Sequence, residues 1–494
     1  MEFADLHPLS LLIFLPVVGA LLVAFTPGLG AGTIKRLAVC FTFASFALSL
    51  ALFALFDRGD SGFQFVEKVS WIPQINVQYH LGVDGLNLPM VVLTTLLGFL
   101  AVLISWKIEL RPREYFAWLL ILESSILGVF CSLDLLLFFL FWEIEVVPMY
   151  FLISIWGGGR RAYSAMKYVI YTILGSAMML AGILTLYATA GSLDMTVLAG
   201  TDLGQFVAVI PLAATFWLLL LGFAVKLPVF PLHTWLPDAH TDAPTAVSVM
   251  LAGSLLKMGG YGMIRICVSV FPDIAREYAP VIVVFAVIGV LYGAALTLRQ
   301  TDLKRLIAYS SISHMGYVLL GIFALSNLSV TGAALQMFSH GMVTGLLFVM
   351  VGLVYDKTHV RDIPALGGLA RQMPVIAVVF SIAGLAALGL PGTSGFAAEF
   401  LVFQGSFSSL TVAGIRVYTL LGVVGIVITA GYILWMLERV FYREAKPRYD
   451  GVKDADTLEL AYISVFVVVI MLVGIYPRIL TDVISAGVKA LPLT

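Results

Sequence analysis

Long apolar stretches, separated by short polar segments, make up most of this chain. Fourteen blocks come close to the ~20 residues that a helix needs to cross a bilayer. They cover residues 8–27, 36–56, 84–106, 114–132, 135–155, 163–189, 207–232, 243–270, 279–299, 304–325, 330–355, 374–404, 416–441 and 459–480. The pattern therefore predicts an all-α polytopic membrane protein without a separate soluble domain.

Composition supports this class. Hydrophobic residues make up 61% of the 494 positions and charged residues only 12%, whereas soluble domains carry about 25% charged residues. A formal net charge of −1 provides no basic field to attract nucleic acid. The three cysteines, Cys40, Cys131 and Cys267, lack the spacing of zinc or iron–sulfur ligands.

The basic residues predict an orientation. Nineteen of the 28 Lys and Arg side chains fall in one set of alternate loops, and six fall in the opposite set. Basic loops stay on the cytoplasmic side of a membrane. We therefore expect a multi-pass protein of the bacterial inner membrane, or alternatively of a thylakoid membrane. Both of its termini would lie on the side opposite the basic loops.

Two predicted spans carry helix-breaking residues. The seventh has Pro228 and Pro231 shortly after Lys226, and the twelfth has Pro391-Gly392 before Glu399. Broken spans about five helices apart are typical of transporters built from inverted repeats. We therefore expect discontinuous seventh and twelfth helices in two inverted five-helix repeats. The expected parts are an N-terminal three-helix segment (1–113, with an extramembrane loop at 57–83), a first repeat (114–270), a second repeat (279–443), and a C-terminal loop with the last helix (444–494).

Ionisable residues inside the spans are the candidate functional groups. A charge at the centre of a membrane helix costs roughly 2.5–3.5 kcal/mol on insertion scales, so such residues are usually functional. The main candidates are Glu143, Lys226, Lys257, His314, His340 and Glu399, and the secondary candidates are Glu145 and Glu123. Burial lowers the proton affinity of a lysine and a nearby carboxylate raises it, while imidazole titrates near neutral pH. This set suits proton transfer.

Simpler explanations exist for single members of this set. One buried Glu or Lys can form a structural ion pair, and one buried His is often a packing residue. Glu143 and Glu145 project about 200° apart on a helix, so both cannot face one partner. Glu123 has no obvious partner. The group His233, Asp238 and His240 fits no standard metal-ligand spacing, so no metal site is expected.

Several motifs, in order, resemble the antiporter-like membrane subunits of respiratory complex I, the proton-translocating NADH:quinone oxidoreductase. They are Trp142-Glu143, Ile155-Trp156-Gly157-Gly158, Lys226-Leu-Pro228, His233-Thr-Trp235-Leu-Pro237-Asp238-Ala-His240, Lys257-Met-Gly259-Gly260-Tyr261, Ala308-Tyr309-Ser310-Ser311-Ile-Ser313-His314 and Leu390-Pro391-Gly392. Within that family the chain is most similar to subunit M, also called subunit 4 (the D subunit in photosynthetic NDH-type complexes). Glu399 stands where the homologous subunits L and N are expected to carry lysine.

The resemblance implies a role for each matched residue. Glu143 would pair with Lys226 as the gating couple, and Lys257 would be the central proton carrier. His314 and His340 would link Lys257 through water to Glu399, the terminal exchange site. Glu145 is similar to the Glu-x-Glu pattern of photosynthetic complexes, which leaves NADH and ferredoxin open as electron donors.

The resemblance also implies partners and cofactors. The chain would carry no cofactor itself, while NAD, FMN, iron–sulfur clusters and quinone would belong to partner subunits. It would assemble with the homologous subunits L and N and with lipid, and would move protons as quinone is reduced elsewhere. A subunit of an Mrp-type cation/proton antiporter, a subunit of a membrane-bound hydrogenase and a purely structural anchor are the alternatives.

Overall fold

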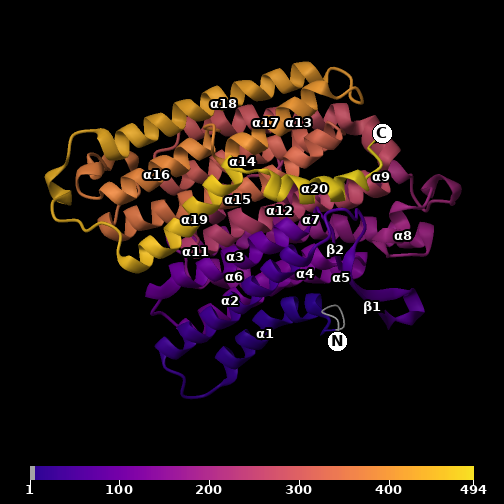
Figure 1. Ribbon diagram of the computed structural model, residues 1–494, viewed down its shortest axis with the longest axis horizontal. Coiled ribbons are helices and arrows are strands. Elements are labelled where there is room, and N and C mark those ends of the chain that lie inside the picture. The colour runs from indigo at the N-terminus through magenta and orange to yellow at the C-terminus, as the bar shows by residue number, and fades with distance from the viewer. Residues whose placement is uncertain (1–5, 494) are drawn as a thin grey trace.

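The helices of this protein run side by side in one bundle (Figure 1); the structure is a computed structural model that describes residues 6–493. Twelve helices in this range are long and apolar enough to cross a membrane. Two further spans are each built from a pair of shorter helices, α9 with α10 and α16 with α17. The total agrees with the fourteen spans that the sequence predicts. Helix α1 begins and helix α20 finishes at the same end of the bundle (Figure 1), as an even number of spans requires.

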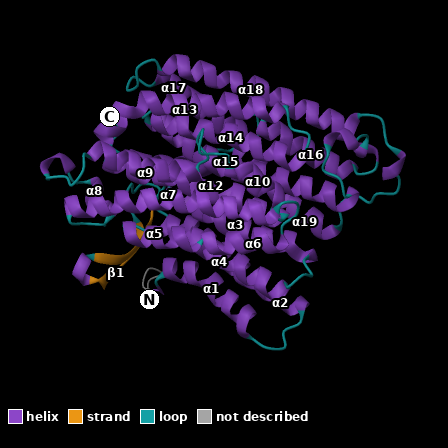
Figure 2. Cartoon of the chain, turned by 180° about the vertical axis from the view of Figure 1, so that it is seen from behind, coloured by secondary structure: helices purple, strands orange, loops and turns teal. Residues whose placement is uncertain are grey.

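The N-terminal segment contains three spanning helices and a β-hairpin. The helices are α1 (Pro8–Phe25), α2 (Ala31–Leu55) and α3 (Leu88–Ile104), and the strands are β1 (Gln64–Ile72) and β2 (Val77–Val83). The strands pair antiparallel, with Val69 opposite Tyr79, and extend beyond the helices at the end where the N-terminus lies (Figure 2). The sequence predicted an ordered loop over 57–83 but not this hairpin.

Charged side chains hold the hairpin against the loop between the sixth and seventh spans. Asp194, which precedes α8 (Met195–Ala199), lies 2.8 Å from the Lys68 ammonium and 3.2 Å from His80 Nδ1. Burial raises the pKa of Asp194, but hydrogen bonds from His80, Lys68 and Thr196 outweigh burial and hold this pKa below its usual range. The hairpin is therefore fastened to the bundle by a carboxylate that stays ionised at neutral pH.

The next five spans form one unit, from the fourth span to the eighth. Their helices are α4 (Pro112–Cys131), α5 (Leu135–Ile144) with α6 (Val146–Trp156), α7 (Arg161–Ala190), α9 (Leu212–Lys226) with α10 (Trp235–Asp242), and the eighth span, Thr245–Val268. The eighth span alternates α-helix, as α11 (Thr245–Met250) and α12 (Leu256–Gly262), with π-helical turns at Leu251–Leu255 and Met263–Val268.

The following five spans repeat this plan. Their helices are α13 (Pro272–Leu298), α14 (Leu303–Phe323), α15 (Asn327–Thr358), α16 (Pro374–Ala387) with α17 (Ser394–Ser408), and α18 (Ile415–Leu437). In both units the fourth span is the broken one. A backbone bridge also joins equivalent loops, Asp134 to Asp194 in the first unit and Asp302 to Asp362 in the second. Five is an odd number of spans, so the second unit starts from the opposite membrane face and its bridge lies there.

The chain finishes with two helices where the sequence predicted one. The last span, α19 (Thr457–Ile475), is shorter than the predicted 459–480, and α20 (Arg478–Lys489) follows it. Pro477 separates them because proline lacks the backbone donor that a continuing helix needs. At the start of α19, Asp456 and Glu459 form a capping box.

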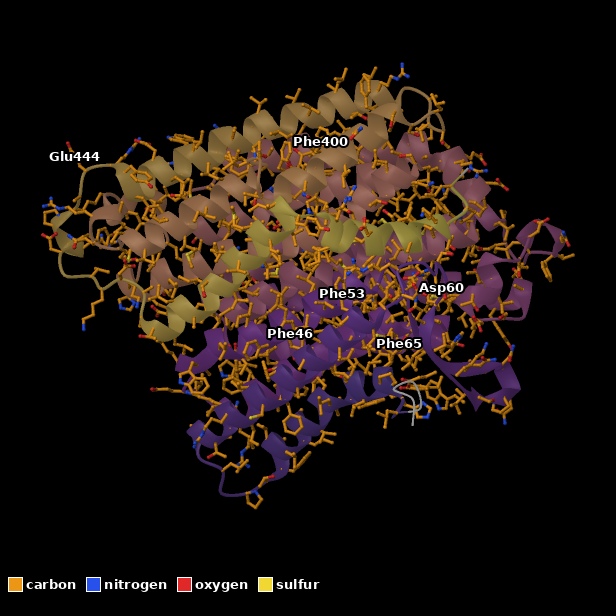
Figure 3. All side chains as sticks on the ribbon, viewed as in Figure 1. Phe46, Phe53, Asp60, Phe65, Phe400 and Glu444 are labelled. Atoms are coloured by element: carbon orange, nitrogen blue, oxygen red, sulfur yellow. The ribbon has the colours of Figure 1, made fainter. Side chains whose placement is uncertain are left out.

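The distribution of side chains over the surface is that of a membrane protein. Many large apolar side chains are exposed. Phe400 on α17, for example, is 53% exposed (Figure 3). Charged side chains such as Asp60 and Glu444 lie in loops toward opposite ends (Figure 3). Inside, α14 and α15 are almost wholly buried, and these two helices carry His314 and His340.

Candidate functional site

The seventh span is interrupted at Lys226, as its prolines predict. Helix α9 ends at Lys226, and α10 begins only at Trp235. One of the carbonyl groups freed near the break, that of Val225, accepts a hydrogen bond from the Trp235 indole at 2.9 Å. The break thus leaves the Lys226 ammonium, 1% exposed, at the end of a half-helix inside the bundle.

Lys226 forms its ion pair with Glu145, and this corrects the sequence-based pairing with Glu143. The Glu145 carboxylate is fully buried; one of its oxygens accepts from the Lys226 ammonium and the other from the Tyr168 hydroxyl at 2.7 Å. Glu145 stands at the joint between α5 and α6, and this joint directs it inward. Glu143 is only half-buried, and its Oε1 atom has no hydrogen-bond partner among the described residues.

Two aromatic rings complete the surroundings of the ammonium. Lys226 Nζ lies 5.4 Å from the ring centroid of Trp142 and 5.3 Å from that of Tyr168. A cation over an aromatic face gains about 2 kcal/mol or more when both are desolvated. The charge of Lys226 is therefore compensated by one carboxylate and two rings. Tyr168 contributes twice, because its ring lies beside the ammonium and its hydroxyl donates to Glu145.

Lys257 occupies the middle of the eighth span, between its two π-helical turns. Its ammonium donates to the carbonyl of Ala252, in the first of these turns, and lies 2.8 Å from His340 Nδ1. Gly259, two residues later, lets the broken seventh span approach. A Cβ at Gly259 would lie 2.7 Å from both the Leu227 nitrogen and the Phe223 carbonyl oxygen.

A second group of ionisable residues continues from His340. The rings of His340 and His314 have centroids 5.7 Å apart, and His314 Nδ1 lies 3.4 Å from Glu399 Oε1. These three side chains line a small space of about 10 Å³, which is close to the room that one water molecule requires. The structure thus brings Lys257, His340, His314 and Glu399 together in that order.

The two groups are separate within the part of the chain that the structure describes. No hydrogen bond or ion pair among residues 6–493 joins Lys226 to Lys257, although their spans pack together at Gly259. Glu123 is also apart from both groups. It is 1% exposed, its two oxygens have no described partner, and it packs against Gly98 of α3.

Three further buried groups were not among the candidate proton-transfer residues predicted from the sequence. They are Tyr168, which holds Glu145; His240, whose ring stacks on Phe348 with centroids 4.5 Å apart; and Lys304, whose ammonium donates to the carbonyl of Ala243. His240 had been considered only as a metal ligand, with His233 and Asp238. Lys304 looked like an ordinary loop lysine because it adjoins Asp302 and Arg305.

His233, Asp238 and His240 each have different surroundings. His233 packs in a cluster with Phe230 and Tyr292, and Asp238 lies 2.7 Å from the Lys167 ammonium. The described residues contain no cluster of three or more His, Cys, Asp or Glu that could hold a metal ion.

Comparison with known proteins identifies the family of this chain. Residues 132–429 match the family model described as "NADH:quinone oxidoreductase/Mrp antiporter, TM". The chain belongs to this family. It is 43% identical over 97% of its length to NAD(P)H-quinone oxidoreductase chain 4 1 of Synechococcus elongatus, covering 90% of that protein. It is 41% identical over 98% of its length to NADH-quinone oxidoreductase subunit M of Rhodobacter capsulatus, covering 96% of that protein.

Two solved structures have the same fold. A chain of respiratory complex I from Thermus thermophilus superposes with a TM-score of 0.86 at 28% identity, over 98% of this chain and 99% of that one. A chain of the Mrp complex from Dietzia sp. superposes with a TM-score of 0.84 at 22% identity, over 99% and 98%. The second likeness concerns the fold alone.

Proposed function

We propose that this chain is a proton-translocating membrane subunit of a quinone oxidoreductase complex, corresponding to subunit M or chain 4. The observation that carries the proposal is the run of buried groups Lys257, His340, His314 and Glu399 inside the bundle, beside the Lys226–Glu145 pair. Relatives at 41–43% identity over nearly the whole chain are named as subunits of such complexes. This chain would move protons, while electron transfer would take place in partner subunits.

The Lys226–Glu145 pair suits the role of a gate. A buried ion pair strongly favours the closed arrangement, because either partner alone would be an uncompensated charge. When Glu145 and Lys226 are paired, their opposite charges exert little net electrostatic field on neighbouring groups. When the pair opens, the Lys226 charge acts on the neighbouring span of Lys257, which packs on it at Gly259. Opening of the pair would thus drive proton release from Lys257.

The second group supplies a path for that proton. Lys257 Nζ can pass a proton to His340 Nδ1 across 2.8 Å. The gap to His314 needs one bridging water, for which the adjoining space is large enough. His314 can then deliver the proton to Glu399, from which it leaves. Because these sites interact, their protonation states change as a set rather than one by one.

The remaining assignments belong to the same proposal. NAD or ferredoxin as donor, FMN, iron–sulfur clusters and quinone would be held by partner subunits, and the homologous subunits L and N would be direct neighbours. The basic loops would face the cytoplasm of a bacterial inner membrane, with both termini on the other side. The excess of Lys and Arg in one set of loops supports this orientation.

The test is a pair of matched glutamate substitutions in the assembled complex. Glu399→Gln removes the acid at the end of the series, and Glu123→Gln removes an equally buried acid outside it. Both variants are reconstituted into liposomes, and protons translocated per quinone reduced are measured. We expect a clear fall for Glu399→Gln and none for Glu123→Gln. Wild-type stoichiometry in an assembled Glu399→Gln complex would contradict the proposed function.

A further inference from the structure

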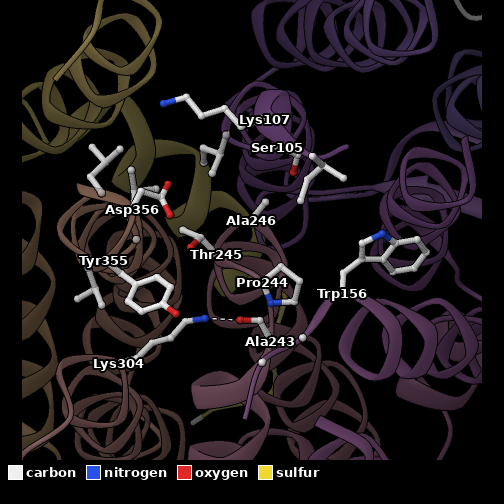
Figure 4. A pocket seen from close by; sticks show the side chains of 18 of the residues that line it. Ser105, Lys107, Trp156, Ala243, Pro244, Thr245, Ala246, Lys304, Tyr355 and Asp356 are labelled. Carbon is white, nitrogen blue, oxygen red and sulfur yellow. Dashed lines mark hydrogen bonds between the residues drawn. The ribbon is translucent and has the colours of Figure 1, made fainter. Parts of the chain in front are cut away.

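The eighth span has different surroundings at its two ends. It begins at Thr245, beside a cavity of about 400 Å³ that Thr245, Ala246 and Lys304 help to line (Figure 4). Toward its other end, Arg265 is bonded to Asp84, which lies in the turn between β2 and α3. The first end of the span therefore has open space beside it, whereas the second is fastened to another part of the chain.

Asp84 and Arg265 form a buried ion pair. A terminal nitrogen of Arg265 lies 2.5 Å from Asp84 Oδ2, and the two residues are 1% and 6% exposed. The other carboxylate oxygen of Asp84 accepts the backbone N–H groups of Leu86 and Asn87. A buried charge without its partner is costly, so the guanidinium is held at this carboxylate.

The turn that carries Asp84 is packed on two sides. The side-chain amide of Asn87 donates to the carbonyl of Phe130 on α4 at 2.8 Å. Gly85 lies so close to α20 that a Cβ there would collide with the carbonyl oxygen of Val483. The carboxylate is therefore a fixed point for the eighth span, and it lies outside the five-helix unit to which that span belongs.

Tyr261 connects this fixed point to the short helix that bears Lys257. Arg265 Nε donates to the Tyr261 hydroxyl at 3.3 Å, and the Tyr261 ring packs on Phe130 with centroids 5.5 Å apart. Lys257, Tyr261 and Arg265 follow one another at intervals of four residues, so they lie along one row of the helix. The direction of the Lys257 side chain is thus tied to that of Tyr261.

The π-helical turn at Met263–Val268 makes this attachment important, because Arg265 lies within it. A π turn holds one more residue than an α turn, and such turns are rare. If this turn relaxed to α-helix, the register would change by one residue and α12 would rotate by about 100°. That rotation would carry the Lys257 ammonium away from His340 Nδ1, which is now 2.8 Å from it.

We propose that Asp84 and Arg265 are positioning residues: their ion pair keeps the second π turn in place and thereby holds Lys257 toward His340. The pair acts on the orientation of Lys257 and takes no part in proton transfer. Its effect on transport rests on the proposed function, whereas the orientation of α12 does not. The competing explanation is that the pair only attaches the turn between β2 and α3 to the bundle.

A chemical cross-link reports the orientation of α12 directly. A Cβ at Gly260 would lie 2.6 Å from the sulfur of Met337 on α15, so cysteines at these two positions face each other. Both are introduced into the full complex in a Cys40→Ser background, because Cys40 is exposed. A short bis-methanethiosulfonate reagent joins the two thiols, and the joined peptides are quantified by mass spectrometry.

Three substitutions are compared in this background. Asp84→Asn keeps an oxygen for Leu86 and Asn87 but removes the charge that faces Arg265, and Arg265→Met removes the guanidinium. We expect the cross-link yield to fall by about tenfold or more in both, because each leaves the pair incomplete. Arg265→Lys keeps a cation for the carboxylate, and we expect it to retain most of the yield. Asp84→Asn, which preserves the shape of the turn, carries the test if Arg265→Met does not assemble.

Lys68→Met is the matched control. It breaks the ion pair of Lys68 with Asp194, which also fastens the β-hairpin to the bundle. We expect the wild-type yield of cross-link from this variant. Wild-type yield in assembled Asp84→Asn would overturn the positioning role. An equal fall in Lys68→Met would overturn it too, since attachment of the hairpin would then be the cause.

Transport is measured in the same substitutions without the added cysteines. We expect protons translocated per quinone reduced to fall in Asp84→Asn to the level of Glu399→Gln, and to recover in Arg265→Lys. A wild-type ratio in Asp84→Asn, despite a lost cross-link, would show that the orientation of Lys257 does not govern transport. Failure of the proposed function itself would be seen separately, as a wild-type ratio in Glu399→Gln, and would leave the cross-linking result unchanged.

Discussion

Substitution of Glu145 by glutamine is the sharpest test of the gate. The carboxylate of Glu145 is the ion-pair partner of Lys226 and accepts the Tyr168 hydroxyl. Glutamine keeps the shape but removes the negative charge, and its amide nitrogen, a donor, can face the ammonium. The buried Lys226 charge then loses its ion-pair partner and keeps the Tyr168 hydroxyl, 3.3 Å away, and the rings of Trp142 and Tyr168.

The size of the effect follows from the burial of the pair. Removing one partner of a buried ion pair costs about 3–5 kcal/mol. At ~1.4 kcal/mol per factor of ten, the balance between open and paired gate changes by two to three and a half powers of ten. Glu143 is half-buried and makes no ion pair with Lys226. We expect Glu143→Gln to cost about 1 kcal/mol or less, the range of exposed pairs.

The assay is proton uptake into liposomes that contain the reconstituted complex, followed by a pH-sensitive dye and divided by the rate of quinone reduction. Subunit content is checked on native gels, so that lost assembly is not mistaken for lost transport. We expect a loss of about a hundredfold or more for Glu145→Gln and less than about fivefold for Glu143→Gln. The reverse order in assembled complexes would refute the pairing seen here and restore the sequence-based one.

Three further predictions follow from other parts of the structure. Lys257→Arg should impair translocation at normal assembly because arginine does not release its proton; wild-type stoichiometry would remove Lys257 from the path. Gly259→Val should lower the stability of the folded subunit by about 1–3 kcal/mol, because its side chain meets the backbone of Leu227. The measurement is the thermal midpoint of the complex, and an unchanged midpoint would show that the seventh span can shift. Because the folded-state pKa of Asp194 lies below its ordinary value of 3.8, its contribution to stability is complete above that value and is lost as pH falls below it. Limited proteolysis of the hairpin should therefore speed up below pH 4 in wild type, and in Asp194→Asn at pH 7; equal rates for the two proteins at pH 7 would contradict this.

Much of the architecture could be predicted because a bilayer imposes simple rules on sequence. Span length, helix-breaking prolines and basic loops are local signals, and they identified fourteen spans and both breaks. The order of Lys257, His340, His314 and Glu399 was also accessible, although through family resemblance rather than geometry. The β-hairpin was missed although its strands pair locally, with Val69 opposite Tyr79; only its attachment to the bundle, through Lys68 and Asp194, joins residues 126 positions apart.

The pairing of Lys226 was beyond the sequence for a different reason. Periodicity establishes that Glu143 and Glu145 face different directions, but it does not say which one points inward. That choice depends on the joint between α5 and α6 and on Tyr168 of α7, a tertiary contact. Lys304 was missed likewise, because a lysine at a helix start appears solvated until the neighbouring Ala243 and the cavity wall are in place.

Because two spans are broken, the partial charges of helix ends lie inside the bundle and act on the buried side chains. The C-terminal end of a helix carries about half a negative charge and the N-terminal end about half a positive one. Lys226 is the last residue of α9, and Glu399 lies in the second turn of α17. Lys226 thus lies at the negative end of α9 and Glu399 close to the positive end of α17, in a medium where such partial charges are poorly screened. A lengthened α9 or α17 would carry its half-charge past the side chain, so the length of each half-helix is as important to ion handling as the residues it bears.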